Sequence, residues 1–414
     1  MKFGFLSRIN GVNQININYM KKLLIVIGLM FLFCFLCGTQ ASAKSEGKKE
    51  LWERAMDAFK HRRIQECDSI FSKLIDSGKL SRKKIDEAYF GMELNARFAG
   101  NFTRAYQVRQ HSLRDGQDDT LQTNYKTLST LPPAMVKRPS EDIEVKYILD
   151  STKASGGEGG LIRIPVTIAG KEEYCILDNG CSEFCFVDSS FAKEHNIRPT
   201  GAQANVYGIV GTEQAEIGIA DSLSIGGMKL YNLLFAIIPD MPQMDTIMRL
   251  DAVLGANFFR LVGEVDFYGK EGKLVFPSRQ QQCESNICLH TSGQCYIEEM
   301  KVNGKYCPMC LDLGADRTRL NSNYYTVYKS RIKRRYQQKN RMFGGVGGIK
   351  ERSVYIVPEM EVEFLGKKFV VRDATIKTDS DNGTDLGGGS LGNDFIKEFS
   401  KVSLNLQRMY LLVE

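Results

Sequence analysis

Two short blocks in the sequence place an acid two positions before a glycine. Asp178-Asn179-Gly180 and Asp312-Leu313-Gly314 each follow a short apolar run. Cleaving an amide without a metal ion or a covalent intermediate needs a general base for water and a general acid for the leaving nitrogen. Two adjacent carboxylates that share one proton supply both roles. The glycines, Gly180 and Gly314, allow backbone N–H groups to approach the acids.

A single Asp-x-Gly triplet is usually only a turn, but these two belong to a duplication of the chain. The regions from about 160 to 277 and from 294 to 414 share three blocks in the same order and at almost constant spacing. The matching positions are Asp178 and Asp312, Tyr207 and Phe343, and Leu254-Gly255 and Leu391-Gly392. Self-similarity of this length predicts two similar lobes with one acid in each. We therefore expect Asp178 and Asp312 to form a pair.

The Gly-rich segments of the two copies are predicted to be mobile hairpins. Each has strand-like flanks, and glycine permits the positive φ angles that tight hairpin turns require. Their candidate substrate-binding residues are Tyr207, Gly208 and Gly211 in the first copy, and Phe343, Gly344 and Gly347 in the second.

The order of these blocks resembles the retropepsin-like aspartic proteases. Each copy has a strand, Asp-x-Gly, a strand, a Gly-rich hairpin, and an apolar-apolar-Gly block before a short helix. The resemblance covers about residues 160–414, and two lobes in one chain are similar in plan to pepsin. It implies a mainly β fold with two closed β-barrels that face each other across a cleft. It also implies an aspartic endopeptidase with catalytic Asp178 and Asp312, flaps that close over an extended peptide or protein substrate, and no cofactor or metal.

The two Asp blocks depart from the family pattern at the residue after the acid. The family has a hydroxyl residue there, which ties the two Asp loops together across the lobes. Asn179 can still donate and accept hydrogen bonds, whereas Leu313 cannot. Half of the network must then be missing or replaced. A catalytically weak or inactive protease-like protein that binds peptides is therefore the alternative hypothesis.

Residues 44–115 have a helical pattern, with breaks at Ser77-Gly78 and Gly100-Asn101. The spacing between Ile64 and Phe102 is close to tetratricopeptide length, so the segment resembles two degenerate tetratricopeptide-type units. The segment is either a docking module or a helical pro-segment or cap. Residues 116–142, with Pro132-Pro133, are predicted to be a linker. The first lobe is expected over 143–280 and the second over 281–414.

Residues 1–43 are predicted to be a signal peptide, with translation starting at Met20. Lys21 and Lys22 precede an apolar run, and Ala41-Ser42-Ala43 is a cleavage site. The mature protein is then exported, periplasmic or extracellular, without a stable membrane span.

The whole chain has 55 basic and 49 acidic residues. The signal segment holds four of the basic residues and no acid, so the remainder is almost neutral and offers no electrostatic case for nucleic acid. The oligomeric state stays open.

Nine cysteines follow the signal segment, and five of them crowd residues 283–310. We expect a disulfide among Cys283, Cys288, Cys295, Cys307 and Cys310. Cys307 and Cys310 form a Cys-x-x-Cys, so a thiol or metal function is a third hypothesis.

The four histidines are scattered and predict no His-based metal site. The basic run from Lys329 to Arg341 is interpreted as a solvated face, or as a feature that favours acidic residues near one end of a bound peptide.

Overall fold

The computed structural model describes residues 43–112, 119–150, 160–181, 183–242, 250–380 and 385–414. The predicted signal peptide and the predicted start at Met20 lie outside these residues, apart from Ala43. The chain divides into two compact units, Met1–Leu51 and Trp52–Glu414, and the description below concerns the second, apart from the start of the first helix. Among the described residues, we find no helix with the length and apolar character needed to span a membrane.

The helices predicted between residues 50 and 113 are present. They are α2 (Ala43–Lys60), α3 (Ile64–Asp76), α4 (Arg82–Phe98) and α5 (Phe102–Ser112). Gly78 and Gly100 end their helices with φ of +64° and +70°, where glycine has no Cβ to clash. The segment predicted to be a linker, residues 116–142, contains helix α6 (Thr120–Ser129) and strand β1 (Met135–Lys137). The Asp119 side chain caps α6 by accepting from the Leu121 N–H.

The first β region is a nine-stranded sheet. Its strand order is β1-β9-β6-β10-β5-β4-β8-β7, with β3 paired to β4. The further strands are β3 (Ile148–Asp150), β4 (Leu161–Ile168), β5 (Lys171–Leu177), β6 (Cys185–Asp188), β7 (Arg198–Tyr207), β8 (Thr212–Ile225), β9 (Met228–Ile238) and β10 (Ala252–Leu254); helices α7 (Ser189–Glu194) and α8 (Ala256–Val262) follow β6 and β10.

The second β region repeats this plan as a ten-stranded sheet. Its order is β13-β14-β17-β22-β18-β21-β20-β15-β16, with β19 paired to β20. The strands are β13 (Cys288–Leu289), β14 (Cys295–Ile297), β15 (Met300–Val302), β16 (Lys305–Tyr306), β17 (Met309–Leu311), β18 (Arg319–Leu320), β19 (Gln337–Gly345), β20 (Gly348–Phe364), β21 (Lys367–Lys377) and β22 (Gly389–Leu391); α9 (Ser322–Arg335) and the 3-10 helix η2 (Asn393–Glu398) correspond to α7 and α8.

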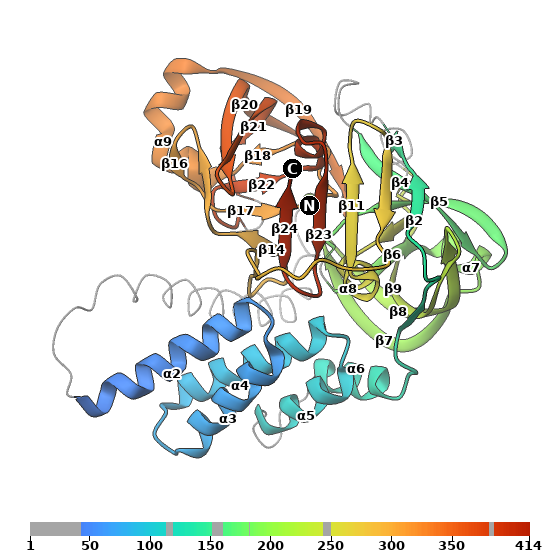
Figure 1. The fold of residues 1–414 in the computed structure, drawn as a ribbon, viewed down its shortest axis with the longest axis vertical. Helices are drawn as coiled ribbons and strands as arrows, with labels where there is room; N and C mark the ends of the chain where they lie inside the picture. Colours follow the sequence, from blue (N-terminus) through green and yellow to red (C-terminus); the bar gives the residue numbers. More distant parts are fainter. Residues whose placement is uncertain (1–42, 113–118, 151–159, 182, 243–249, 381–384) are drawn as a thin grey trace, which may run out of the picture. The chain divides into compact units, whose positions relative to one another are not determined.

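A third sheet joins the two lobes. It has five strands in the order β2-β12-β11-β23-β24: β2 (Ile143–Lys146), β12 (Lys273–Phe276), β11 (Glu264–Tyr268), β23 (Val402–Asn405) and β24 (Tyr410–Val413). The hairpins β11–β12 and β23–β24 are corresponding parts of the two copies, and β11 pairs antiparallel with β23 (Figure 1). Corresponding strands of the two copies therefore pair with each other in one sheet. The predicted mainly β, two-lobed fold is confirmed.

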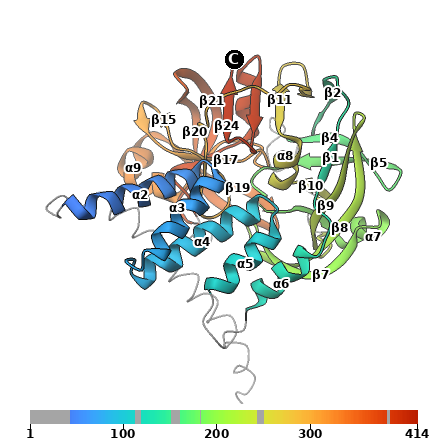
Figure 2. The same cartoon turned by 60° about the horizontal axis from the view of Figure 1, so that its bottom comes forward.

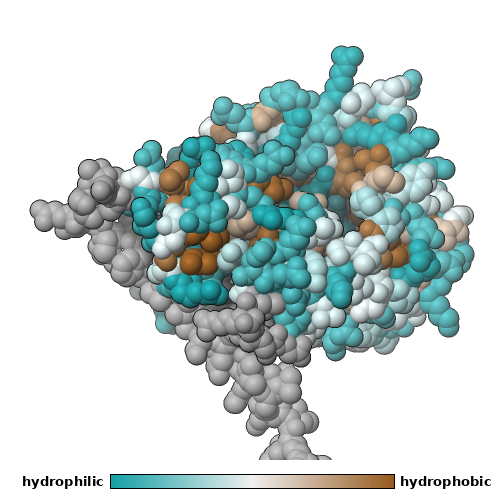
Figure 3. All heavy atoms as spheres, turned by 90° about the horizontal axis from the view of Figure 1, so that it is seen from below, coloured by the Kyte–Doolittle hydropathy of each residue, from teal (hydrophilic) through white to brown (hydrophobic). Residues whose placement is uncertain are grey.

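Helices α4, α5 and α6 pack against the first lobe (Figure 2). Arg97 in α4 donates twice to the Glu183 carboxylate, at 2.9 and 2.6 Å. In α6, the Asn124 amide accepts from the Gln203 N–H at 3.0 Å and donates to the Gln203 carbonyl at 2.6 Å. Asn124 thus hydrogen-bonds the backbone N–H and carbonyl of Gln203 in β7, as a neighbouring strand would. The face that carries the helices is mostly hydrophilic, with small hydrophobic patches (Figure 3).

Candidate active site

Each predicted acid stands directly after the last residue of a buried central strand. Asp178 follows β5, which runs parallel to β10, and Asp312 follows β17, which runs parallel to β22. The Asp178 N–H donates to the Leu254 carbonyl at 3.1 Å, and the Asp312 N–H donates to the Leu391 carbonyl at 3.0 Å. The apolar-Gly blocks therefore fix the backbone of both acids.

Close packing explains why a glycine follows Leu254 and Leu391. A Cβ atom on Gly255 would overlap the Phe184 carbonyl oxygen, and one on Gly392 would overlap the Arg317 carbonyl carbon. Backbone atoms at such positions cannot move aside without shifting the Asp loops. The glycines thus let the loops rest directly on the apolar-Gly blocks.

The structure brings Asp178 and Asp312 together. A Cβ atom placed on Gly180 would lie 2.7 Å from an Asp312 carboxylate oxygen and 3.0 Å from an Asp178 carboxylate oxygen. One point therefore lies close to an oxygen of each acid. The Gly314 Cα is also close, because an added Cβ there would overlap both Asp178 carboxylate oxygens. Gly180 and Gly314 are required here because any side chain would displace the acids.

The surroundings hold protons on this pair. Burial and the neighbouring Asp312 raise the pKa of Asp178 to about 7, against the hydrogen bonds from the Cys181, Gly180 and Gly314 N–H groups. Burial also raises the pKa of Asp312, while the Arg319 guanidinium opposes the rise. Two acids this close cannot both ionise easily. The pair can therefore share one proton, while Arg319 favours the charged form of Asp312.

Asn179 connects the two Asp loops with both atoms of its amide. Its Nδ2 donates to the Leu311 carbonyl at 2.8 Å, and its Oδ1 accepts from the Leu313 N–H at 2.7 Å. The side chain is completely buried. The half of the cross-lobe network that belongs to Asn179 is therefore intact.

Leu313 makes no such bond, as its side chain predicted, and instead packs in the core. Another residue adds a second link between the lobes. The Asn393 Nδ2, at the start of η2, donates to the Gly160 carbonyl at 2.9 Å and to the Leu313 carbonyl at 3.3 Å. The missing half of the network is thus replaced by a residue that the sequence did not identify. The repeat aligns Asn393 with Ala256, so no pattern signals its role.

The two predicted flaps are hairpins whose tips touch. The β7–β8 hairpin turns at 208–211, and the β19–β20 hairpin turns between Gly345 and Gly348. The Gly211 N–H donates to the Val346 carbonyl at 3.3 Å, and an Arg352 Nη2 donates to the Ile209 carbonyl at 3.0 Å. Glycine is needed at the contact, because a Cβ on Gly208 would overlap the Val346 carbonyl oxygen.

The two aromatic flap residues do not lie in equivalent surroundings. Phe343 is buried in a small cluster with Val354, Ile356 and Ile209, whereas the Tyr207 side chain is 61% exposed. Phe343, Gly344 and Gly347 lie in the second hairpin and its tip. Tyr207 lies at the base of the first turn and points mainly to solvent. The contact residues Ile209 and Val346 were not among the predicted site residues.

All nine cysteines after the signal segment are described and free. The prediction of a disulfide in residues 283–310 was therefore wrong. Cys310 and Cys288 both lie opposite Tyr296, whereas Cys295 is the next residue along its strand and so points to the other face. Burial raises the pKa of the Cys307 thiol to about 12, which disfavours thiolate chemistry there. Within the described residues, no three His, Cys, Asp or Glu side chains form a metal-binding group.

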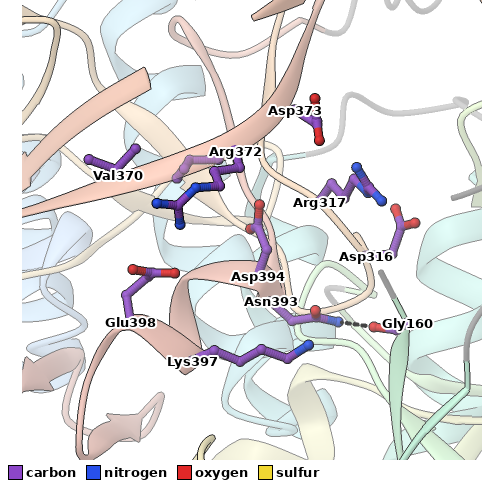
Figure 4. A pocket seen from close by; sticks show the side chains of 11 residues that line it. Gly160, Asp316, Arg317, Val370, Arg372, Asp373, Asn393, Asp394, Lys397 and Glu398 are labelled. Atoms are coloured by element: carbon purple, nitrogen blue, oxygen red, sulfur yellow. Dashed lines mark hydrogen bonds between the residues drawn. The ribbon is translucent and has the colours of Figure 1, made fainter. Parts of the chain in front are cut away.

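A polar cavity of about 150 Å³ lies beside the second Asp loop rather than at the acids (Figure 4). Its lining includes Gly160, Asp316, Arg317, Asn393 and Asp394. The Asp394 carboxylate accepts from the N–H and the hydroxyl of Thr318, at 2.9 and 2.7 Å. This cavity therefore belongs to the support of the second Asp loop.

One family model matches part of the first lobe. Residues 164–258, which hold the first Asp loop, the first flap and Leu254-Gly255, match a family model described as aspartyl protease. This part of the chain is therefore aspartyl protease-like. No curated protein matches the chain.

Two solved structures with low similarity also match. Basic 7S globulin from soybean has 11% identity and a TM-score of 0.40; the match covers 67% of this chain and 94% of that one. EIAV protease complexed with the inhibitor HBY-793 has 22% identity and a TM-score of 0.17; the match covers 24% of this chain and 81% of that one.

Proposed function

We propose that this protein is an exported aspartic endopeptidase whose catalytic pair is Asp178 and Asp312. The observation that carries the proposal is the meeting of these two carboxylates, one from each lobe, around Gly180 and Gly314. The aspartyl protease match over 164–258 and the touching flaps support it. Export rests on the sequence pattern of residues 20–43 alone.

The chemistry follows from the unequal environments of the two acids. Ionised Asp312 takes a proton from a water molecule, which attacks the peptide carbonyl carbon. Protonated Asp178 donates its proton to the carbonyl oxygen. Proton transfer from the pair to the amide nitrogen then allows the carbon–nitrogen bond to break, and the flaps exclude bulk water during the step.

Replacing Asp178 with Asn, and separately Asp312 with Asn, tests the proposal. Peptide-library cleavage is measured from about pH 3 to pH 8, and we expect each variant to lose at least about 1000-fold in kcat/KM, in the range of an essential acid or base. The exposed Asp221→Asn is the matched control, since Asp221 forms an ion pair with Arg198 at the surface. Activity of the Asp178→Asn variant equal to that of the wild type would exclude Asp178 as a catalyst.

The wild-type pH profile gives an independent check. We expect kcat/KM to fall as the pH rises through about 7, because Asp178 then loses the proton that it must donate. A profile that rises through neutral pH would contradict the assignment of Asp178 as the acid.

The second candidate is a peptide-binding protein with little or no catalysis. Leu313 favours it, because an apolar side chain occupies the place of a hydroxyl that helps to align the family's acids. Binding of peptides with no cleavage by the folded wild-type protein at any tested pH would select this candidate. The helical segment would then serve as a docking module, whereas in the peptidase it would be a cap.

A further inference from the structure

A single arginine stands between the second acid and the second flap. Arg319 begins β18, shortly after Asp312 in the chain, and is half-buried. Its Cζ atom lies 5.8 Å from the centroid of the Phe343 ring, and its charge acts on Asp312. Arg319 forms no ion pair with any residue that the structure describes. The guanidinium is partly desolvated and acts on Asp312 without forming an ion pair with it, so its N–H groups can still bind the carboxylate of a ligand.

Two further arginines lie on the same side of the second flap. The Arg352 Cζ is 5.9 Å from the Phe343 centroid, and Arg341 lies directly opposite Arg352 in the β19–β20 register. Side chains opposite each other in an antiparallel pair share one face. The nearby acids are Asp379, whose carboxylate is half-exposed and 3.7 Å from an Arg352 nitrogen, and Asp312, on which Arg319 acts. The three arginines therefore outnumber these two acids.

The first lobe has no such charges at the equivalent places. The repeat aligns Ser390 of the second lobe with Val253 of the first. Arg319 lies opposite Ser390. The residue opposite Val253 is Phe186. The repeat aligns Tyr207 with Phe343, so the pair in the first flap that corresponds to Arg341 and Arg352 is Asn205 and Gln214. The two halves of the duplicated site therefore differ in charge, and a peptide that spans both meets cations on one side only.

We infer that the half of the cleft formed by the second lobe binds an acidic side chain of the substrate, with Arg319 as the residue that selects it. A carboxylate of Asp or Glu would accept two parallel N–H bonds from the planar guanidinium. The inference rests on the proposed peptidase function and adds the class of peptide that the site prefers. The first lobe has the buried, uncharged Phe186 at the equivalent place.

The test is a peptide library in which Glu, Gln, Lys and Leu are placed in turn at each position on both sides of the cleaved bond. We expect Glu to exceed Gln about 10- to 100-fold in kcat/KM at one position, the range of a hydrogen bond to a charged group. Arg319→Gln removes this preference, Arg319→Lys keeps part of it, and Arg319→Glu transfers it to Lys-containing peptides. The control is Arg331→Gln, which removes one charge from the exposed face of α9 and leaves the preference unchanged.

Peptide binding to the Asp178→Asn variant separates this inference from the proposed function. Fluorescence anisotropy compares one labelled peptide with its Glu→Gln partner at low and high salt. Tighter binding of the Glu peptide, abolished by adding Arg319→Gln, supports the inference even when the wild type cleaves nothing. Equal cleavage and equal binding of Glu and Gln peptides at every position by proteins with wild-type Arg319 would overturn it. This comparison of Glu and Gln peptides uses only proteins that keep Arg319, so it does not depend on the folding of an Arg319 variant.

Discussion

At the scale of the single residue, Asn179 links the two Asp loops with one side chain. In retropepsin-like aspartic proteases, two hydroxyl side chains share this role. One amide side chain donates to the second loop and accepts from it. Leu313, at the matching place, contributes only apolar packing. The alignment of the acids therefore depends unequally on the two lobes, and the first lobe's residue is the more sensitive one.

Replacing Asn179 with Ala is expected to destabilise the protein by about 2–4 kcal/mol, since it leaves the buried Leu313 N–H without an acceptor. We also expect kcat to fall more than KM rises, because the acids lose their alignment. Chemical denaturation and peptide kinetics measure the two effects. Asn179→Thr restores a donor and an acceptor and should recover part of both. A fully active and stable Asn179→Ala variant would show that Asn393 suffices to hold the loops.

The raised pKa of Asp178 predicts a pH dependence of stability. A carboxyl whose pKa is about 7 in the folded protein and about 3.9 when unfolded stabilises the fold below about pH 4. This stabilisation is lost as the pH rises toward about 7. The free energy of unfolding of the wild type should therefore fall relative to Asp178→Asn over this range, by up to about 1.4 kcal/mol per pH unit. Denaturant titrations at several pH values measure this difference, and a constant difference between the two proteins would contradict the assignment.

At the scale of the elements, the flap tips are shaped to meet. Gly208 and Gly211 of the first turn lie against Val346 and Gly347 of the second, with no room for a Cβ at Gly208 or Gly347. Flaps that touch when closed must separate to admit a peptide. Their contact is made by backbone atoms and a few side chains, which suits a lid that opens and closes.

A Gly208→Ala substitution is expected to hold the flaps apart, because its Cβ would collide with the Val346 carbonyl. We expect a loss of about tenfold or more in kcat/KM with little loss of global stability, since the change lies at a loop tip. Steady-state kinetics and thermal melting measure the two quantities. Thr212→Ala, an exposed change beside the same turn, serves as control. Unchanged kinetics for Gly208→Ala would mean that closure of the tips is not needed.

Helix α6 restrains the first flap at its base. An Asn124→Ala substitution removes both hydrogen bonds to Gln203, each worth about 1 kcal/mol. Hydrogen exchange of the Gln203 amide should accelerate by about five- to thirtyfold, whereas Lys126→Ala on the exposed side of α6 should leave it unchanged. Exchange at Gln203 that does not respond to Asn124→Ala would place the restraint elsewhere.

On the scale of the whole molecule, the helices, both lobes and the joining sheet share their core. One continuous hydrophobic cluster includes Phe71 of α3, Phe235 of the first lobe, Leu311 of the second, and Phe267 and Leu404 of the joining sheet. Removing any one region would expose the apolar faces of the others. We therefore expect residues from Trp52 onward to unfold as one unit.

The single tryptophan, Trp52, offers a direct test, because it packs on Phe71 in the helical segment. Leu404→Ala, far along the chain in β23, should lower the free energy of unfolding by about 2–4 kcal/mol. Tryptophan fluorescence and far-ultraviolet circular dichroism should report the same transition in both proteins. A tryptophan transition that stays in place while the β signal shifts would mean that the helical segment is an independent domain.

Much of this architecture could be predicted because it is encoded in local patterns. The nearly constant spacing between the repeated blocks predicted two lobes and paired Asp178 with Asp312. Helical periodicity and glycines located α2 to α5. Helix α6 within the predicted linker was missed, because polar residues such as Thr120 and Asn124 mask a helix that is stabilised by tertiary contacts. The disulfide prediction failed because crowding in the sequence does not reveal which sheet face a cysteine occupies.

By itself, the sequence determined the duplication, the positions of the two acids and the glycines that must lie close to them, since each is written in residue type and spacing. Only the tertiary structure decided that Asn179 reaches both Leu311 and Leu313, that Asn393 supplies a second link, and that the flaps touch. It also placed Arg319 beside Phe343, which lies beyond α9 in the chain. These features depend on strand register and side-chain direction between distant segments, which no local pattern specifies.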